Sequence, residues 1–393
     1  MHPRQITTAD VQGKRVLCRV DFNVPLKDGT ITDDTRIRAA VPTITWLRDH
    51  GARVILASHL GRPKGKAVDS LRMTPVGARL SELLGSPVVT VEDITGPLAR
   101  QAIESMHDGD VVLLENLRFD PREEANDEAL ARELGSLADI YVNDAFGAAH
   151  RAHASTEGVA HVLPAYTGFL MQAELDALGK LLAQPERPFV AIIGGAKVSD
   201  KLAVLENLLT HTDALLIGGG MANTFLLAQG YDVGKSLVEE DLVDTARSLL
   251  QKAEEGGVSV VLPSDVVVAE SIDATEGNVT SVDQVDDNVA IFDIGPGSAE
   301  GYARLVGDAR TVFWNGPLGV AENPAFTNGT ATVARAVAAC DGYTVIGGGD
   351  SVAAIEHLGL ADRIDHISTG GGASLEFLEG RELPGVAAIP EVE

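Results

Sequence analysis

The stretch ARVILASHLGRP (residues 52–63) decides the fold of this chain. Its first half is a run of aliphatic residues without polar alternation, which is typical of a strand buried on both faces. Its second half is a loop that carries His59 and Arg62 around a glycine. In an open parallel sheet, a loop after a strand lies at the carboxyl edge, where ligands bind. The stretch therefore predicts an α/β fold with a binding site at the ends of its strands.

The same rhythm of apolar run and amphipathic segment continues along the whole chain. Helical patterns follow the strand-like runs, for example over residues 34–50 and 126–137. Strands that are apolar on both faces and separated by helices indicate parallel sheets covered by helices on both faces. The other strand-like runs are KRVLCRV, DVVLLEN and ADIYVND in the first half, and PFVAIIGG, DALLIGGG, GVSVVLP, VAIFDIG, TVFWNGP and YTVIGGG in the second.

The length of 393 residues predicts two domains. One segment breaks the alternation near the middle: residues 168–183 form a long amphipathic helical pattern, which we interpret as an interdomain helix. The first domain then covers residues 1–167 and the second covers residues 184–380. Residues 270–288 are acidic and polar, and this composition predicts a surface excursion.

The composition excludes several classes of partner. A formal net charge of -26 disfavours nucleic acids and anionic membranes, because the field of the protein repels polyanions. Two cysteines far apart in sequence fit a reducing compartment. The first ten residues lack the apolar core of a signal peptide, and no uncharged apolar run reaches membrane-spanning length. We therefore expect a cytoplasmic protein.

The loops after the first-half strands carry polar and cationic side chains. A single arginine is usually a solvated or capping charge, but here several reach one sheet edge of an acidic protein. The guanidinium group suits phosphate and carboxylate, so the set predicts a small, multiply anionic ligand. For His59 alone, a satisfied loop histidine is the alternative to ligand binding. The side chains concerned are Asp21, Asn23, Arg36, His59, Arg62, Arg118, His150 and Arg151.

The second-half loops are rich in glycine instead. Backbone N–H groups can approach a ligand closely at glycine, and a helix that begins after the loop favours anions at its N-terminus. Tight turns between strand and helix would explain one or two glycines, but not triple-glycine runs after three strands. These loops predict a nucleotide site. They are GGAKVSDK (194–201), IGGGMANTF (217–225), DIGPG (293–297), WNGP (314–317), GGGDS (347–351) and TGGGAS (369–374).

Taken together, the motifs resemble the phosphoglycerate kinase family over essentially the whole chain and in order. They are RVDFNVP, SHLGRP, ENLRF, NDAFGAAHRAHAS, GGAKVSDK, IGGGMANTF, WNGP, GGGDS and TGGGAS. The resemblance implies two Rossmann-like domains with a cleft between them, and a C-terminal tail (381–393) that returns to the first domain. It further implies a glycolytic enzyme that moves the acyl phosphate of 1,3-bisphosphoglycerate to Mg-ADP, reversibly, giving 3-phosphoglycerate and ATP. Because the complete cleft would lie within one chain, a monomer is sufficient.

The resemblance also implies a role for each matching residue. The catalytic residues would be Arg36 and Lys197, and the Mg²⁺ residue would be Asp350. The phosphoglycerate-binding residues would be Asp21, Phe22, Asn23, Arg36, His59, Leu60, Gly61, Arg62, Arg118 and Arg151. The nucleotide-binding residues would be Gly194, Gly195, Lys197, Lys201, Gly219, Phe292, Asn315, Pro317, Glu322, Gly348, Gly349, Asp350 and Ser351.

Two other functions keep parts of this pattern. A nicotinamide-dependent dehydrogenase would share the α/β halves, but it requires a complete glycine fingerprint with an acidic ribose partner, which we do not find. A two-domain anion-binding protein would not need Lys197 or Asp350. Phosphoryl transfer to an anionic oxygen needs no general base, which agrees with the absence of a convincing nucleophile and base pair. It does require two domains to close around both ligands.

Overall fold

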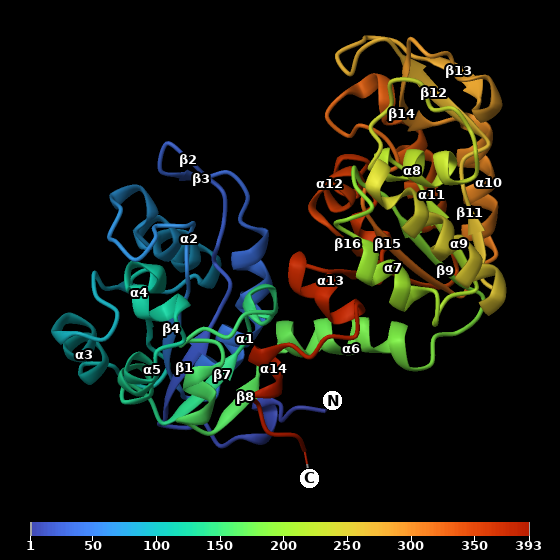
Figure 1. The fold of residues 1–393 in the computed structure, drawn as a ribbon. Coiled ribbons are helices and arrows are strands. Elements are labelled where there is room, and N and C mark those ends of the chain that lie inside the picture. The colour runs from blue at the N-terminus through green and yellow to red at the C-terminus, as the bar shows by residue number, and fades with distance from the viewer. Residues whose placement is uncertain (1, 393) are drawn as a thin grey trace. The chain divides into compact units, whose positions relative to one another are not determined.

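The structure is a computed structural model that describes residues 2–392. The chain forms two compact units. One unit consists of the residues up to Asp176 together with the residues from Glu382 onward. The other unit comprises Ala177–Arg381. Helix α6 (Phe169–Ala183) carries the chain from the first unit into the second. Each unit is built around its own parallel sheet (Figure 1).

The first unit contains a parallel sheet of six strands. Strand β1 lies in its middle, between β4 and β7, and every pairing is parallel. The carboxyl ends of these strands therefore share one edge. In order across the sheet, the strands are β5 (Val89–Thr90), β6 (Val111–Leu113), β4 (Arg53–Ala57), β1 (Arg15–Arg19), β7 (Ile140–Asn143) and β8 (Ala165–Thr167). A short hairpin of β2 (Leu26–Lys27) and β3 (Thr30–Ile31) follows β1.

Helices cover both faces of this sheet because successive strand residues point to opposite sides. On β1, Val16 and Cys18 pack into one buried cluster with residues of α1 (Thr35–Asp49) and α2 (Thr74–Leu84). Leu17 packs into a second cluster on the other face, with residues of α3 (Pro97–Glu104) and α5 (Glu128–Gly135). The short helix α4 (Pro121–Glu124) precedes α5.

The C-terminal segment packs on the first unit. Helix α14 (Pro384–Ala387) lies in this segment, and the Nδ2 group of Asn143 at the end of β7 donates to the carbonyl oxygen of Gly385 over 3.0 Å. Pro3 and Glu391 form an antiparallel bridge. The two ends of the chain therefore lie side by side on this unit (Figure 1).

The second unit repeats the parallel design. Its six-stranded sheet has the order β11 (Ser259–Val261), β10 (Ala214–Ile217), β9 (Phe189–Ile193), β15 (Thr311–Asn315), β16 (Tyr343–Gly347) and β17 (His366–Ile367). The helices are α7 (Leu202–Leu208), α8 (Gly220–Ala228), α9 (Val243–Gly256), α10 (Pro296–Gly307), α11 (Asn328–Ala339), α12 (Gly349–His357) and α13 (Gly372–Leu378). The predicted fold class, two parallel α/β domains with helices on both sheet faces, is confirmed.

The second sheet also buries both faces. Val190 and Ile192 of β9 lie in one cluster with apolar residues of α10 and α11. On the opposite face, Ile217 of β10 lines a small apolar space with Phe225 of α8 and Leu249 of α9. The apolar runs seen in the sequence thus reflect strands enclosed between two helical layers.

One expectation for the second half was wrong in detail. The run VAIFDIG forms β14 (Ala290–Ile294), which pairs antiparallel with β12 (Asp265–Ala269) in a separate three-stranded sheet. The acidic segment 270–288 is largely exposed, as expected, and it contains β13 (Asn278–Ser281), the other antiparallel neighbour of β12. An apolar run does not reveal the direction of its partner strands, and β13 is polar because it lies exposed at an edge.

A buried carboxylate lies where α6 begins. Asp144 directly follows β7, and its Oδ1 atom accepts the backbone N–H of Met171 over 3.1 Å. Complete burial raises the pKa of Asp144 to about 6. Hydrogen bonds from Thr43 and from the first turn of α6 lower the pKa, but their effect is smaller than that of burial. Its protonated form therefore favours the folded state. This stabilisation is present below the ordinary aspartate pKa and is lost as pH rises through about 6.

We expect Asp144→Asn to flatten the pH dependence of the unfolding free energy of the first unit. Relative to the wild type, the variant should gain on the order of 2 to 3 kcal/mol between pH 4.5 and 7.5, since it has no charge to bury. Denaturant unfolding in a Trp314→Phe background reports this unit through Trp46 of α1. Parallel pH profiles for the two proteins would contradict the assignment.

Candidate functional site

Loops from neighbouring strands meet at the carboxyl edge of the first sheet. The strands β6, β4, β1 and β7 are adjacent in this order, so the loops that follow them lie together. The predicted residues Asp21, Phe22 and Asn23 follow β1; His59, Leu60, Gly61 and Arg62 follow β4; Arg118 follows β6; and Arg151 follows β7. The structure thus gathers the whole predicted group at one edge of the first unit.

Side-chain amides hold these loops in place. The Oδ1 atom of Asn23 accepts the N–H of Gly61 over 2.8 Å. Asn116 accepts the N–H of Leu60 over 3.1 Å and donates to the carbonyl oxygen of Leu60 over 2.7 Å. Gly61 has a φ of +64°, and a Cβ atom there would lie 2.8 Å from a methyl carbon of Leu71. The β4 loop is therefore rigidly held and requires glycine at this position.

Two predicted residues contribute apolar side chains to the core. Phe22 and Leu60 are buried in the cluster that covers one sheet face. The N–H of Phe22 donates to the Oγ atom of Ser58 over 2.9 Å. These two residues fix the path of the loops, and their side chains are not exposed to a ligand.

Arg36 lies in the first turn of α1 and reaches back to the β1 loop. Its Nη1 group donates to Oδ2 of Asp21 over 3.0 Å and to the carbonyl oxygen of Asn23 over 3.3 Å. The Arg36 side chain is 35% exposed, whereas that of Asp21 is only 7% exposed. Asp21 therefore orients the guanidinium group while leaving part of it open to a ligand.

Three further arginines differ in how firmly they are held. Arg118 is mostly buried, donates to the carbonyl oxygen of Gly61 over 2.9 Å and lies 3.3 Å from a carboxylate oxygen of Glu124. Burial lowers the pKa of Arg118, and neighbouring arginines add to this effect. Arg62 and Arg151 are exposed, and Nε of Arg151 donates to His150 over 3.2 Å. The edge thus combines a fixed cation with two adaptable ones.

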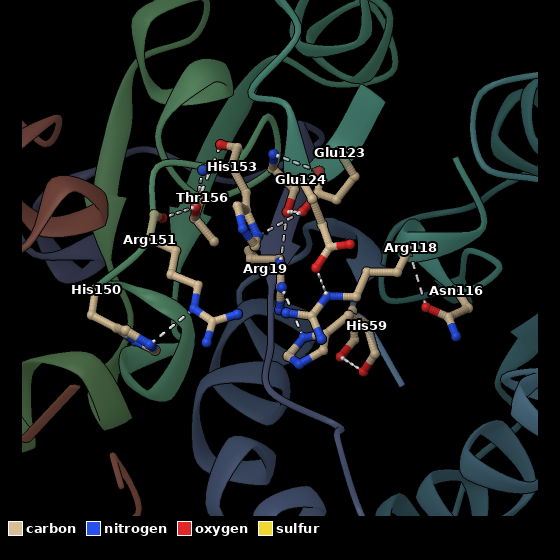
Figure 2. Close-up of polar contacts among 12 residues, drawn as sticks. Arg19, His59, Asn116, Arg118, Glu123, Glu124, His150, Arg151, His153 and Thr156 are labelled. Carbon is tan, nitrogen blue, oxygen red and sulfur yellow. Dashed lines mark hydrogen bonds and ion pairs between the residues drawn. The ribbon is translucent and has the colours of Figure 1, made fainter. Parts of the chain in front are cut away.

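His59 is a neutral hydrogen-bond donor in this arrangement. Its Nδ1 atom lies 3.0 Å from Nη2 of Arg19 (Figure 2). Arginine can only donate, so Nδ1 accepts and the ring proton resides on Nε2. Burial holds the pKa of His59 well below its usual range, and the nearby charges of Arg19 and Arg118 lower it further.

Several buried polar residues pack beneath these side chains, and the sequence did not predict them. Arg19, His153 and Glu123 are buried at the same edge (Figure 2), and the buried Ser155 contacts both Arg19 and Glu123. Burial, reinforced by nearby arginines, lowers the pKa of His153 to about 4, so this ring is neutral near pH 7. Arg19 had a visible signal, since this charged residue stands between Cys18 and Val20 in an apolar run, at the end of β1. Glu123 had none, because acidic residues are frequent in this chain.

In the second unit, glycine turns bring separate loops into direct backbone contact. Gly194 donates to the carbonyl oxygen of Asn315 over 2.9 Å, and Gly195 donates to that of Pro317 over 3.0 Å. A Cβ atom on Gly194 would lie 2.1 Å from the Pro317 oxygen. At Gly219, φ is +69° and a Cβ atom would lie 2.6 Å from the Gly195 oxygen. These predicted residues therefore form one interlocked backbone surface.

The two predicted lysines differ in their surroundings. Lys201 is partly buried and donates to Oδ1 of Asn315, and burial lowers its pKa. The Nδ2 group of the buried Asn315 has no hydrogen-bond partner among residues 2–392. Lys197 is exposed on the loop after β9. One lysine is therefore held in position, whereas the other is open to solvent.

The start of α12 is built for an anion. Gly348 precedes the helix with a φ of +89°, and Gly349 and Asp350 are exposed in its first turn. The Oγ atom of the buried Ser351 accepts the N–H of Gly316 over 2.7 Å, which fastens this helix start to the β15 loop. The N-terminal N–H groups of a helix favour phosphate.

Asp350 by itself fits a Mg²⁺ site that has a single protein carboxylate. Within residues 2–392, no group of three or more His, Cys, Asp or Glu residues is arranged to hold a metal ion. Mg²⁺ commonly binds through one or two carboxylates and completes its shell with substrate phosphates and water. An exposed carboxylate beside an anion-binding helix start suits such a shared ion.

A cavity of about 300 Å³ lies next to these turns within the second unit. Five predicted residues line it: Gly195, Phe292, Pro317, Glu322 and Asp350. The mostly apolar wall residues outside the predicted loops 194–201 and 217–225 gave no signal in the sequence. Nine further residues complete the wall. They are Ala196, Gly220, Asn223, Leu237, Ile272, Ile291, Gly319, Val320 and Ala321. The volume suits a small ligand with an apolar ring.

Comparison with known proteins gives a consistent match along the chain. The sequence profile of the family described as phosphoglycerate kinase matches residues 6–381. The phosphoglycerate kinase of Moorella thermoacetica is 63% identical over 383 residues, which are 97% of this chain and 98% of that protein. The phosphoglycerate kinase of Roseiflexus sp. strain RS-1 is 60% identical over 392 residues, which are 99% of each chain.

Solved structures agree with the sequence matches. The structure of phosphoglycerate kinase from Coxiella burnetii is similar with a TM-score of 0.91 and 43% identity, and the match covers 98% of each chain. The crystal structure of phosphoglycerate kinase from Pyrococcus horikoshii OT3 has a TM-score of 0.86 and 36% identity, again over 98% of each chain. The similarity therefore extends over both units.

Proposed function

The chain belongs to the phosphoglycerate kinase family, and from this premise we propose how its two units divide the work of catalysis. It is a phosphotransferase that moves the acyl phosphate of 1,3-bisphosphoglycerate to ADP, reversibly, giving 3-phosphoglycerate and ATP, a reaction of glycolysis. This assignment of the two substrates to different units is supported by the contrast between the units. One presents cations at a sheet edge, and the other presents glycine backbone around a cavity.

The first unit binds the phosphoglycerate. Its loops offer guanidinium groups that suit both the carboxylate and the phosphate of the acid. Arg118 gives a fixed charge, Arg62 and Arg151 give mobile ones, and His59 donates a neutral N–H. Asp21 and Asn23 hold the loops and Arg36, and Asn23 also fixes Gly61. Phe22 and Leu60 act through the core beneath.

The second unit binds the nucleotide. The base and ribose fit the cavity beside Phe292 and Glu322. The phosphates lie against the glycine turns and the start of α12, where backbone N–H groups point outward. Lys201, held by Asn315, neutralises phosphate charge. The residues with this role are Gly194, Gly195, Lys197, Lys201, Gly219, Asn315, Pro317, Gly348, Gly349, Asp350 and Ser351.

Asp350 holds the Mg²⁺ of the Mg-nucleotide. Bound there, Mg²⁺ would supply charge neutralisation between the phosphates. The protein's own contribution is to place the carboxylate at the rim of the cavity, next to the first turn of α12. Only one carboxylate is needed, because the nucleotide provides the other oxygens.

The chemical step needs no general base from the protein. The acceptor oxygen is already anionic, so catalysis consists of positioning and charge stabilisation along an in-line path. Arg36 and Lys197 contact the transferring phosphoryl oxygens, Arg36 from the acid side and Lys197 from the nucleotide side. The side chain of Arg36 is partly exposed, and Lys197 is exposed, so both are accessible to a ligand.

Because the acid and the nucleotide bind to different units, the units must close for transfer. We expect full closure only when both ligands are bound. Small-angle scattering with 3-phosphoglycerate alone, with Mg-ADP alone and with both ligands measures the closure. 3-Phosphoglycerate and Mg-ADP do not react with each other, so the mixture is stable during the measurement. The radius of gyration should fall most in the ternary mixture. An unchanged radius there would contradict ligand-driven closure.

A coupled assay tests the proposed function as a whole. With 3-phosphoglycerate, ATP and Mg²⁺, the enzyme should form 1,3-bisphosphoglycerate, which a coupling dehydrogenase reports through NADH oxidation. Omission of Mg²⁺, with a chelator present, should abolish the signal. A protein that binds the acid but never turns over would support the anion-binding alternative instead.

We further propose a monomer that acts in the cytoplasm on small molecules and not on nucleic acid. The strong negative charge supports this, since it opposes binding to polyanions. Each ligand site proposed above is formed within this one chain, so a second copy is not required. Among the described residues, no helix has both the length and the apolarity to cross a bilayer.

A further inference from the structure

A completely buried carboxylate lies beneath the cationic edge. Glu123 of α4 is 0% exposed. Its Oε1 atom accepts the hydroxyl proton of Ser155 over 2.5 Å, and its Oε2 atom accepts the N–H of Ser155 over 3.0 Å. The carbonyl oxygen of Glu123 accepts the N–H of Ala154 over 3.0 Å. Glu123 thus fastens the loop after β7 to α4.

The hydrogen bonds continue from Ser155 to His59 through Arg19, which donates to both of them. Because the Ser155 hydroxyl gives its proton to Glu123, its oxygen is free to accept, and it accepts Nε–H of Arg19 over 2.8 Å. Arg19 in turn donates from Nη2 to Nδ1 of His59 over 3.0 Å. Figure 2 shows Glu123, Arg19 and His59 of this series close together. The hydrogen bonding of the His59 ring therefore depends on Glu123 through two residues, Ser155 and Arg19.

The charges explain why this carboxylate is buried. Arg19 is 1% exposed and lies among other cations, so its charge requires a nearby anion. Glu123 provides that anion through Ser155, and His153 lies 3.9 Å from the same carboxylate. Without Glu123, the Ser155 hydroxyl that accepts Nε–H of Arg19 would lose its own acceptor and could turn, and the guanidinium group, which also donates from Nη1 to the carbonyl oxygen of Val20, could shift away from His59.

We propose that Glu123 is a positioning residue for the acid substrate. Through Ser155 it orients Arg19, and Arg19 keeps the proton of His59 on Nε2, so that His59 donates to an anionic oxygen of the phosphoglycerate. Glu123 does not touch the substrate. This inference rests on the proposed function of the first unit and adds to it a carboxylate that controls affinity for the acid.

The variant Glu123→Gln tests this. An amide can accept only one of the two Ser155 hydrogen bonds, and its NH₂ group faces the other donor. We expect the KM for 3-phosphoglycerate to rise about tenfold. The kcat and the KM for ATP should change less than about twofold, because a binding interaction common to ground and transition state is lost. An unchanged KM for the acid would overturn the proposal.

Substitutions at Ser155 provide the second arm. Ser155→Ala should raise the KM for the acid by a similar factor, and the double variant should be no worse than either single one, because the two residues act in series. Ser155→Thr keeps a hydroxyl and should stay close to the wild type. If Glu123→Gln does not fold, Ser155→Ala and Ser155→Thr are sufficient as the test. Equal KM values of these two variants for 3-phosphoglycerate would overturn the proposal.

Two controls separate positioning from general stability. Leu80→Ala removes buried volume from α2 and no hydrogen bond, so it should lower stability without a selective change in the KM for the acid. Nitrogen-15 NMR of the histidine rings reads the tautomer directly. In the wild type Nδ1 of His59 should be unprotonated, and Glu123→Gln should give mixed tautomers; an unaltered spectrum would count against the proposal. An inactive wild type would instead refute the proposed function.

Discussion

Replacement of Arg36 by alanine should lower kcat on the order of 10³-fold, the largest loss that we expect from any single substitution. The transferring phosphoryl group carries its charge over three equatorial oxygens, and water in place of a guanidinium group stabilises that charge poorly. The KM for 3-phosphoglycerate should change less than about threefold, since Arg62, Arg118 and Arg151 still bind the acid. Steady-state kinetics with both substrates varied measures the two effects separately.

The matched control for Arg36 lies two residues further along the same helix. Arg38 is exposed and pairs over 2.8 Å with Asp34, the residue that precedes α1. Arg38→Ala removes the same type of side chain and should leave kcat within about twofold, as expected for a surface ion pair. Arg36→Lys keeps a charge near Asp21 and should fall between the wild type and the alanine variant. A raised KM with a preserved kcat in Arg36→Ala would make Arg36 a docking residue only.

Replacement of Lys197 by alanine should lower kcat on the order of 10²- to 10³-fold, the second largest effect. Lys197 is exposed on the glycine-rich loop after β9, so it can move to the phosphoryl group when the nucleotide binds. Lys201 is held by Asn315 and should keep most of the nucleotide affinity in this variant. The KM for ATP should therefore rise much less than kcat falls.

Lys235→Ala is the control for Lys197. Lys235 is an exposed lysine of the same unit that does not line the nucleotide cavity. Its removal lowers the positive charge of the unit by the same amount and should leave kcat unchanged. Equal losses in Lys197→Ala and Lys235→Ala would mean that overall charge, and not contact with the phosphoryl group, produces the effect.

Local patterns were sufficient to predict most of the sheet architecture. Apolar runs marked the strands β1, β4, β9 and β15, because a strand enclosed by two helical layers has no polar face. They were not sufficient for β14, which is equally apolar but pairs antiparallel with β12. The direction of a neighbouring strand depends on the path of the intervening chain, which periodicity does not encode.

The candidate site was predictable wherever a residue type carries its own signal. Arginines after strands and glycines before helices stand out from the sequence. Asn116, which holds the β4 loop, and Asn223, which lines the cavity, lie in the quoted motifs ENLRF and IGGGMANTF, but no role was predicted for either, because an asparagine in a loop or helix has many possible roles. Their place in the site follows from contacts with residues far away in the sequence.

By itself, the sequence determined that two α/β units present cations from one half and glycine turns from the other, because strand burial and backbone freedom depend on residues close together in the chain. Only the tertiary structure decided that Asp21 orients Arg36 and that Glu123 reaches His59 through Ser155 and Arg19. Glu123 and Ser155 are 32 residues apart, and Arg19 and Ser155 are 136 apart. Such hydrogen bonds form only when packing of the sheet brings separate loops to one edge, and burial there gives them their strength.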